Sequence, residues 1–213
     1  MNHIAVVYLA FEPEGQTPVW KFLNSYMAYP AGQIHDLVMH HAREGQDLLH
    51  YRLAALGLSA EYLCFLNTHT QVRRTNWLKT MMEHIGVNGV NLVGSMGSWE
   101  ACPNDGVTFP NPHIRTNGFL VERRAFLDVS DRRFKSKIEC YDFESGPGNM
   151  ASRMSGVVVG TNGTAYRLNE LKESKTFRLD NQENLLFSDN QTRHYDAAPP
   201  EERKRLRELA WGE

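Results

Sequence analysis

The stretch Glu61-Tyr-Leu-Cys-Phe-Leu-Asn-Thr-His-Thr-Gln71 joins a continuous apolar run to a cluster of small polar residues. Its apolar part, Tyr62 to Leu66, lacks polar alternation, which is typical of a strand covered on both faces within a parallel sheet. Residues 67–70 would then lie at the carboxyl end of this strand, where open α/β sheets bind their ligands. The alternative is an ordinary polar turn in which Asn67 shapes the backbone and His69 has no chemical role.

Composition places the chain among ordinary soluble globular proteins. It has 213 residues, of which 41% are hydrophobic and 23% charged, and its net charge is -2. This length supports one substantial core, and we find no repeat, low-complexity tract or linker that would divide it, so we expect a single domain over residues 1–213. The near-neutral charge gives no support for a nucleic-acid partner.

Cysteine usage and hydropathy indicate the compartment. The three cysteines are far apart and odd in number, which favours neither a disulfide framework nor a zinc site and fits a reducing cytoplasm. The N-terminus lacks the features of a signal peptide, and no apolar stretch approaches the roughly 20 residues that cross a bilayer. We therefore expect a cytoplasmic protein with no transmembrane segment, for which any membrane association is peripheral.

Strand and helix patterns alternate along the chain, which predicts an α/β fold with a mostly parallel central sheet flanked by helices. Thr17 and Pro18 are expected to begin the first helix, and Leu49, Leu53 and Leu56 to form the buried face of the second. Strands are predicted over residues 4–9, 34–40, 61–66, 90–93, 118–121 and 157–159, and further helices over 46–58, 77–85, 124–129 and the charged C-terminal segment 199–213.

Between these elements, residues 94–112 form a predicted loop of roughly 20 residues, a length that is usually functional or mobile. Polar clusters are predicted in four loops, at residues 67–70, 111–117, 142–146 and 189–195. In the first, Asn67 and His69 are spaced so that both face one ligand. Histidine is a good ligand for Mn²⁺, Zn²⁺ or Fe²⁺ and a poor one for Mg²⁺.

The second cluster places His113, Arg115 and Asn117 at alternating positions, which share one face if the backbone is extended. Arginine and histidine together suit a phosphate or carboxylate group. The alternative is a polar strand edge with Arg115 in a salt bridge.

The third cluster holds two carboxylates, Asp142 and Glu144, in a turn shaped by glycine and proline. A carboxylate presented in this way can act as a general base, and either residue is a candidate. The alternative is a solvated turn carboxylate without a role. In the fourth cluster, Gln191 and Arg193 could close over an anionic ligand, or Arg193 could be an ordinary surface residue.

The order of these features resembles the family 2-type nucleotide-sugar glycosyltransferases of GT-A fold, specifically the divergent glycosyltransferase-like proteins of bacterial surface-polysaccharide loci. Residues 65–78 and 90–94 are similar to the family's Asp-x-Asp turn, tryptophan-leucine helix and valine-glycine strand. Asn67 and His69 occupy the places of the two acidic residues. Residues 117–126 are similar to the acceptor-side strand and its Arg-Arg-x-x-Phe turn, and the resemblance covers about residues 1–195.

The resemblance implies inverting transfer of a sugar from a nucleotide-sugar donor to a glycan or lipid-linked acceptor. A divalent metal, Mn²⁺ or Mg²⁺, is implied by the family, but Asn67-x-His69 replaces its usual acidic ligands, and His69 is the candidate ligand here. The residues assigned are Glu144 or Asp142 as catalytic base, Asn67, His69, Arg115, Gln191 and Arg193 on the nucleotide or diphosphate, and Trp99, His113 and Asn117 on the acceptor.

Two other functions fit the same residues. One is a catalytically silent GT-A-like module that binds a nucleotide or glycan and assists a partner enzyme, which the loss of the acidic pair favours. The other is a metal hydrolase that uses His69 and His113, although no paired-histidine spacing supports it.

Overall fold

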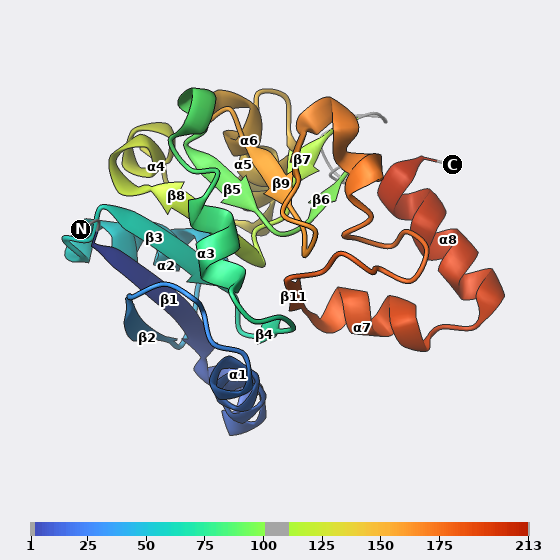
Figure 1. The fold of residues 1–213 in the computed structure, drawn as a ribbon. Helices are drawn as coiled ribbons and strands as arrows, with labels where there is room; N and C mark the ends of the chain where they lie inside the picture. Colours follow the sequence, from blue (N-terminus) through green and yellow to red (C-terminus); the bar gives the residue numbers. More distant parts are fainter. Residues whose placement is uncertain (1–2, 101–110, 213) are drawn as a thin grey trace.

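The structure is a computed structural model that describes residues 3–100 and 111–212, and its centre is a seven-stranded sheet (Figure 1). The strand order is β10-β9-β5-β8-β3-β1-β2. The strands are β1 (Ile4–Phe11), β2 (Asp36–Ala42), β3 (Tyr62–Leu66), β5 (Leu92–Gly94), β8 (Gly118–Glu122), β9 (Val157–Val159) and β10 (Ala165–Arg167).

Strand directions confirm the predicted mostly parallel sheet. Strand β1 pairs in parallel with both β2 and β3, and β5 pairs in parallel with β9. Strand β8 is antiparallel to its neighbours β3 and β5, and β10 is antiparallel to β9. Five of the seven strands therefore run in one direction, and the α/β class with a single central sheet is as predicted.

Strand β3 is covered on both faces, as its unbroken apolar run predicts. Leu63 and Phe65 belong to one apolar layer and Cys64 and Leu66 to the other, and all four side chains are fully buried. Because successive side chains of a strand point to opposite faces, an apolar run without alternation fills both layers at once.

Helices cover both faces of the sheet (Figure 1). Among residues 3–100 and 111–212, no helix is both long enough and apolar enough to cross a bilayer. One layer contains α1 (Gln16–Ala28) and α3 (Trp77–Met82), and the other contains α2 (Asp47–Gly57), α4 (Arg123–Val129), α5 (Lys137–Ser145) and α6 (Met150–Arg153). Short 3₁₀ helices are η1 (Glu12–Glu14), η2 (Val87–Gly89) and η3 (Leu168–Ser174).

The C-terminal segment lies along one side of the sheet, with α7 and α8 at the right of Figure 1. It contains β11 (Phe187–Ser188), α7 (Asn190–Ala197) and α8 (Pro200–Trp211), which confirms the predicted charged C-terminal helix. Strand β11 pairs with β4 (Gln71–Val72), and the Trp211 indole Nε1 donates to the Phe177 carbonyl at 2.9 Å. These contacts attach the end of the chain to its middle.

The predicted buried face of α2 is wrong. Leu53 and Leu56 are 48% and 58% exposed, whereas the residues that face the core are Leu48, Tyr51, Ala54 and Ala55. The large Tyr51 ring packs against the sheet together with the small side chains of Ala54 and Ala55. The spacing of the leucines therefore predicts the wrong face of the helix as the buried one. The first helix also begins earlier than predicted, at Gln16, with Gly15 rather than Thr17 as its N-cap.

Two predicted loops are helices. Asp142 and Glu144 lie on α5, which starts with a capping box between Ser136 and Glu139. Gln191 and Arg193 lie on α7, which the Asp189 side chain caps. In both cases the cap starts the helix before the residues that resemble a turn. The predicted loop 94–112 is paired at its ends by β6 (Gly97–Ser98) and β7 (His113–Ile114), and its residues 101–110 lie outside the described part.

Candidate active site

A recess of about 460 Å³ opens at the carboxyl ends of β1 and β3, on the side of the sheet covered by α2 and α5. It brings together three of the predicted site residues, Asn67, His69 and Glu144. We call it the carboxylate recess, and its lining consists of Phe11, Glu14, Gly45, Gln46, Asp47, Leu48, Asn67, Thr68, His69, Thr116, Lys137, Cys140, Tyr141 and Glu144.

The turn that follows β3 is held by its own side chains. The Asn67 Oδ1 atom accepts hydrogen bonds from the His69 backbone N–H at 3.0 Å and from the Thr70 Oγ1 hydroxyl at 2.9 Å. The Asn67 backbone N–H in turn donates to the Asn117 carbonyl at 3.3 Å. The side-chain oxygen of Asn67 therefore builds the turn, and only its Nδ2 remains as a donor for a ligand.

Strand β1 fixes the same turn from below. The Tyr8 hydroxyl donates to the Thr68 carbonyl at 2.6 Å, and the Thr68 hydroxyl donates to the Leu9 carbonyl at 2.9 Å. The Tyr8 ring stacks on Phe22 of α1, with ring centres 3.9 Å apart. Burial raises the pKa of Tyr8, so its hydroxyl stays a donor. These two hydrogen bonds hold the turn in a fixed position relative to β1.

His69 projects from this fixed turn into the recess, and its side chain is 29% exposed. Its Nε2 atom lies 3.7 Å from the Glu14 Oε2 atom, which comes from the short helix after β1.

Glu144 enters the recess from α5, and its Oε1 atom accepts the Thr116 backbone N–H at 2.8 Å. Burial raises the pKa of Glu144, against the lowering effects of Arg115 and of the Thr116 hydrogen bond, and the nearby charge of Asp47 raises it further. A carboxylate whose pKa is raised in this way is a stronger base than an ordinary glutamate, which suits general-base chemistry.

Asp47 is the main site residue that the sequence did not reveal. It is the first residue of α2 and lines the recess opposite the β3 turn. Burial among the surrounding protein atoms raises the pKa of the Asp47 carboxyl. Nearby His50, His69 and Lys137 lower it. Its side chain remains accessible from the recess. The glycine turn Glu44-Gly45-Gln46 after the second strand is the signal that marks this position.

Asp142, the other predicted base, points away from the recess. Its carboxylate pairs with Arg132 at 2.8 Å, and it is not among the residues that line the recess. Two residues on a helix are about 200° apart around its axis, so Asp142 and Glu144 cannot face the same ligand.

The side chains of Arg115 and His113, in the second polar cluster, make contacts within the protein. Arg115 pairs with Glu100 at 3.3 Å and stacks on the Phe177 ring at 4.3 Å, so the salt-bridge alternative describes it. His113 is buried, its Nδ1 atom lies 2.9 Å from the Asn111 carbonyl, and burial lowers its pKa to about 4. Neither residue lines the carboxylate recess.

The remaining predicted residues lie elsewhere. Asn117 supports the β3 turn through its carbonyl, and Trp99 packs on Trp211 with ring centres 6.0 Å apart. Gln191 accepts a hydrogen bond from Arg178. Arg193 reaches the turn from the other side, where its Nη1 atom donates to the His69 carbonyl at 3.2 Å.

A divalent metal at the β3 turn would need more ligands than the neighbouring side chains supply. Within the described part of the chain, no three His, Cys, Asp or Glu residues are grouped so that they could hold a metal ion. His69 and Glu14 are two donors, and the Asn67 oxygen is already used. Because Mn²⁺ and Mg²⁺ favour several oxygen ligands, these residues alone do not fit such an ion, and metal dependence stays a prediction.

No protein-family model matches the chain, and no curated protein matches it. Solved structures that it is similar to are glycosyltransferases, and the likeness in fold is distant. One takes part in glycosylation of the major capsid of PBCV-1 (14% identity, 60% of this chain, TM-score 0.38); others are the bifunctional enzyme WbbM (9%, 61%, 0.43) and GlyE of Streptococcus pneumoniae TIGR4 (8%, 60%, 0.39). The matched parts span 63%, 34% and 36% of those chains.

Proposed function

We propose that this protein is a glycosyltransferase that moves a sugar from a nucleotide-sugar donor to a hydroxyl of a glycan or lipid-linked acceptor. The observation that carries the proposal is the pair Asp47 and Glu144, two carboxylates with raised pKa in one recess at the carboxyl ends of parallel strands. Transfer of this kind needs one carboxylate to accept the acceptor's proton and polar groups to hold the donor.

Glu144 is the general base in this proposal. The Thr116 N–H holds its Oε1 atom, which leaves Oε2 to accept the proton of the attacking hydroxyl. The raised pKa increases its basicity at the cost of a smaller ionised fraction at acidic pH. A base on one side of the donor sugar and a leaving diphosphate on the other correspond to inversion at the anomeric carbon.

Asp47 and Lys137 act on the donor. The Asp47 carboxylate can accept hydrogen bonds from hydroxyl groups of the ribose or sugar, and Lys137 offers a cation within the same recess. If Mn²⁺ or Mg²⁺ takes part, the diphosphate of the donor would have to supply most of its ligands, because His69 and Glu14 alone do not fit such an ion. The bacterial surface-polysaccharide setting, the cytoplasmic location and the peripheral membrane association belong to the same proposal.

A second candidate is a catalytically silent module that binds a nucleotide or glycan. One observation favours it. The side-chain oxygen of Asn67 accepts hydrogen bonds within the turn, at a position where the resembled family has an acidic residue.

Thermal shift with sugar nucleotides and nucleoside diphosphates, with and without Mn²⁺, followed by donor-hydrolysis and transfer assays, separates the two. The transferase predicts stabilisation by at least one sugar nucleotide and turnover that Glu144→Gln removes. Binding with no turnover, unchanged by Glu144→Gln, would favour the silent module, and stabilisation by none of the ligands would reject the transferase.

A further inference from the structure

A second recess, of about 260 Å³, lies on the α1 side of the β3 turn. It shares Glu14, Thr68 and His69 with the carboxylate recess, so the two meet at the His69 side chain. Its other lining residues come from the start of α1, from β4 and from α7, and two of them are the cations Lys21 and Arg193. We call it the basic recess.

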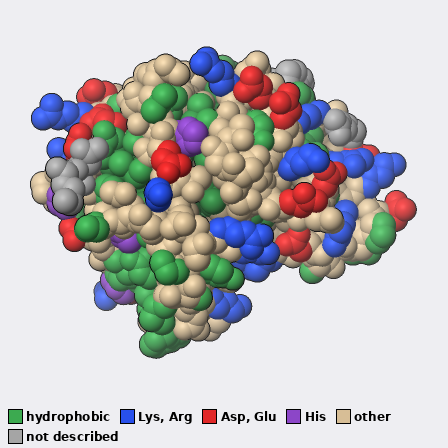
Figure 2. All heavy atoms as spheres, in the orientation of Figure 1, with side chains coloured by type: hydrophobic (Ala, Val, Ile, Leu, Met, Phe, Trp, Pro, Cys, Tyr) green, Lys and Arg blue, Asp and Glu red, His purple; other side chains and the backbone are tan. Residues whose placement is uncertain are grey.

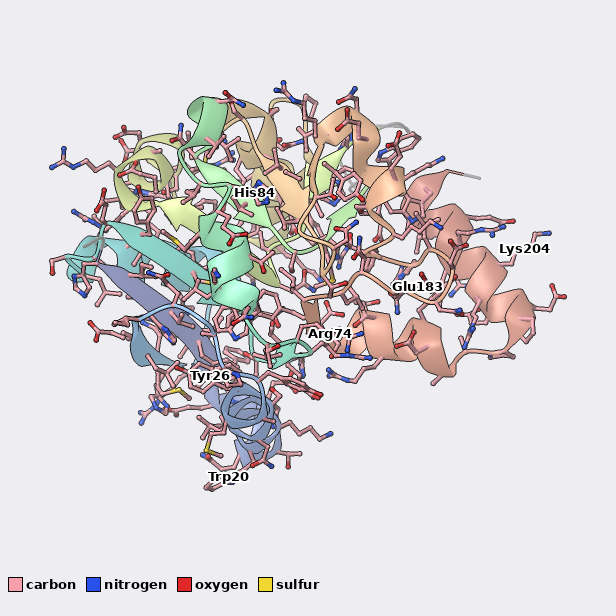
Figure 3. All side chains as sticks on the ribbon, in the orientation of Figure 1. Trp20, Tyr26, Arg74, His84, Glu183 and Lys204 are labelled. Atoms are coloured by element: carbon pink, nitrogen blue, oxygen red, sulfur yellow. The ribbon has the colours of Figure 1, made fainter. Side chains whose placement is uncertain are left out.

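The cations in and next to this recess form no ion pairs in the described part of the chain. Among residues 3–100 and 111–212, Lys21, Arg73, Arg74 and Arg193 have no carboxylate within the 4.0 Å that defines an ion pair. Figure 2 shows Lys and Arg side chains gathered between β4 and α7, and Figure 3 places Arg74 there. The carboxylate that does line the recess, Glu14, faces His69 at 3.7 Å. The recess therefore has an excess of positive charge in a protein whose net charge is -2.

Arg193 is held in place before any ligand arrives. Pairing of β11 with β4 brings the start of α7 against the β3 turn, and the Arg193 Nη1 atom donates to the His69 carbonyl. Burial lowers the pKa of Arg193, and nearby Arg73 lowers it as well, while Asp189 raises it. Since a free arginine titrates far above neutral pH, the group remains a cation with the rest of its fork of donors free for a ligand.

The start of α1 adds to this field. Gly15 at its N-cap offers no side-chain cap, and the first turn contains no acidic residue. Thr17 and Pro18 of that turn line the recess. The N-terminal end of α1, where the helix dipole is positive, therefore borders the same recess as the two cations.

We propose that the basic recess binds a phosphate group carried by a substrate, with its oxygens shared between Lys21 and Arg193. Arginine donors match phosphate oxygens in pairs, and lysine adds a point charge. The proposal rests on the proposed function only in treating the phosphate carrier as a substrate. The phosphate belongs either to the diphosphate of the donor or to a phosphorylated acceptor.

Pyrophosphate binding by the full chain, measured by isothermal titration calorimetry, tests the site without any turnover. The double variant Lys21→Ala/Arg193→Gln should bind pyrophosphate at least about 10-fold more weakly, because charge-assisted hydrogen bonds are lost. A control, Lys204→Ala/Arg124→Gln, removes the same charge from exposed positions elsewhere and should bind as the wild type does. Equal affinities of the two double variants, or no binding by the wild type at millimolar pyrophosphate, would overturn the proposal.

Two further variants keep this result interpretable. Lys21→Ala alone changes an exposed side chain, so it preserves the fold and should still weaken binding. Glu144→Gln should bind pyrophosphate normally even where transfer is lost, so a failure of the proposed function is distinguishable from a failure of the basic recess.

Two assays identify the phosphate carrier. A donor phosphate predicts that Lys21→Ala/Arg193→Gln weakens binding of nucleoside diphosphates and leaves nucleosides unaffected. An acceptor phosphate predicts unchanged nucleoside diphosphate binding and a raised KM for phosphorylated acceptors relative to unphosphorylated ones. Either pattern supports the recess, and a variant that changes neither quantity contradicts it.

Discussion

The two recesses on either side of the β3 turn have opposite charge. The carboxylate recess, on the α2 and α5 side, holds Asp47 and Glu144, and the basic recess, on the α1 and α7 side, holds Lys21 and Arg193. They are adjacent, yet the carboxylates and the cations form no ion pairs across the turn among the described residues. The hydrogen-bonded β3 turn lies between them, so each charge remains available to a ligand.

The largest expected effect comes from removing the proposed general base of the carboxylate recess. Glu144→Gln keeps the acceptor for the Thr116 N–H and removes the base, so kcat should fall about 10²- to 10⁴-fold. Steady-state transfer kinetics provide the measurement. Asp142→Asn, which alters a carboxylate on the opposite side of the same helix, should leave kcat near the wild-type value, and equal losses in both variants would argue against Glu144 as base.

The next effect concerns the helix beneath the carboxylate recess. Leu48 is buried and also lines the recess, so Leu48→Ala should lower the free energy of unfolding by about 2–5 kcal/mol. Leu53 is 48% exposed, and Leu53→Ala should change it by about 0.5 kcal/mol or less. Urea unfolding of both variants checks the orientation of α2. The reverse ranking would restore the face that leucine spacing predicts.

The turn itself can be broken without changing any charge. Thr70→Val removes the hydroxyl that bonds to Asn67 and to the Asn117 carbonyl, in a fully buried position. It should destabilise the fold by about 1–3 kcal/mol, because buried acceptors lose their donor. Both transfer and pyrophosphate binding should weaken, since both recesses share this wall. A loss confined to one recess would show that the turn does not organise both.

The smallest effect is a shift in pH dependence. The charge of Asp47 raises the pKa of Glu144, so Asp47→Asn should lower that pKa. A base works when ionised, and its activity is lost as the pH falls through its pKa. The acidic limb of kcat/KM should therefore move to lower pH in the variant. An unchanged limb would mean that the two carboxylates do not interact or that another group sets the limb.

Sequence reasoning found the parts of the site that depend on local signals. Ligands bind at the carboxyl ends of parallel strands, so the apolar run of β3 predicts a site at Asn67 and His69, and both residues line the recess. Glu144, predicted as a candidate base, lines the same recess. Asp47 follows the same rule at the end of β2, but the histidines in that strand weakened its apolar pattern.

The rest depends on contacts that no local pattern encodes. Arg193 reaches the β3 turn through the pairing of the two-residue strands β4 and β11, which lie far apart in the sequence. Such short strands carry no periodic signal. Arg115 and His113 have the residue types of binding groups, and no local pattern predicts that Arg115 stacks on Phe177 and that His113 contacts the Asn111 carbonyl.

The shared wall between the recesses has a kinetic consequence. His69 lines both recesses, so we expect a ligand that contacts its side chain on one side to change the affinity on the other. If the donor and the acceptor bind on opposite sides of His69, both are present when the transfer takes place. We therefore expect initial-rate plots with intersecting lines, the pattern of a sequential mechanism, and no exchange of labelled nucleoside diphosphate into the nucleotide sugar in the absence of acceptor.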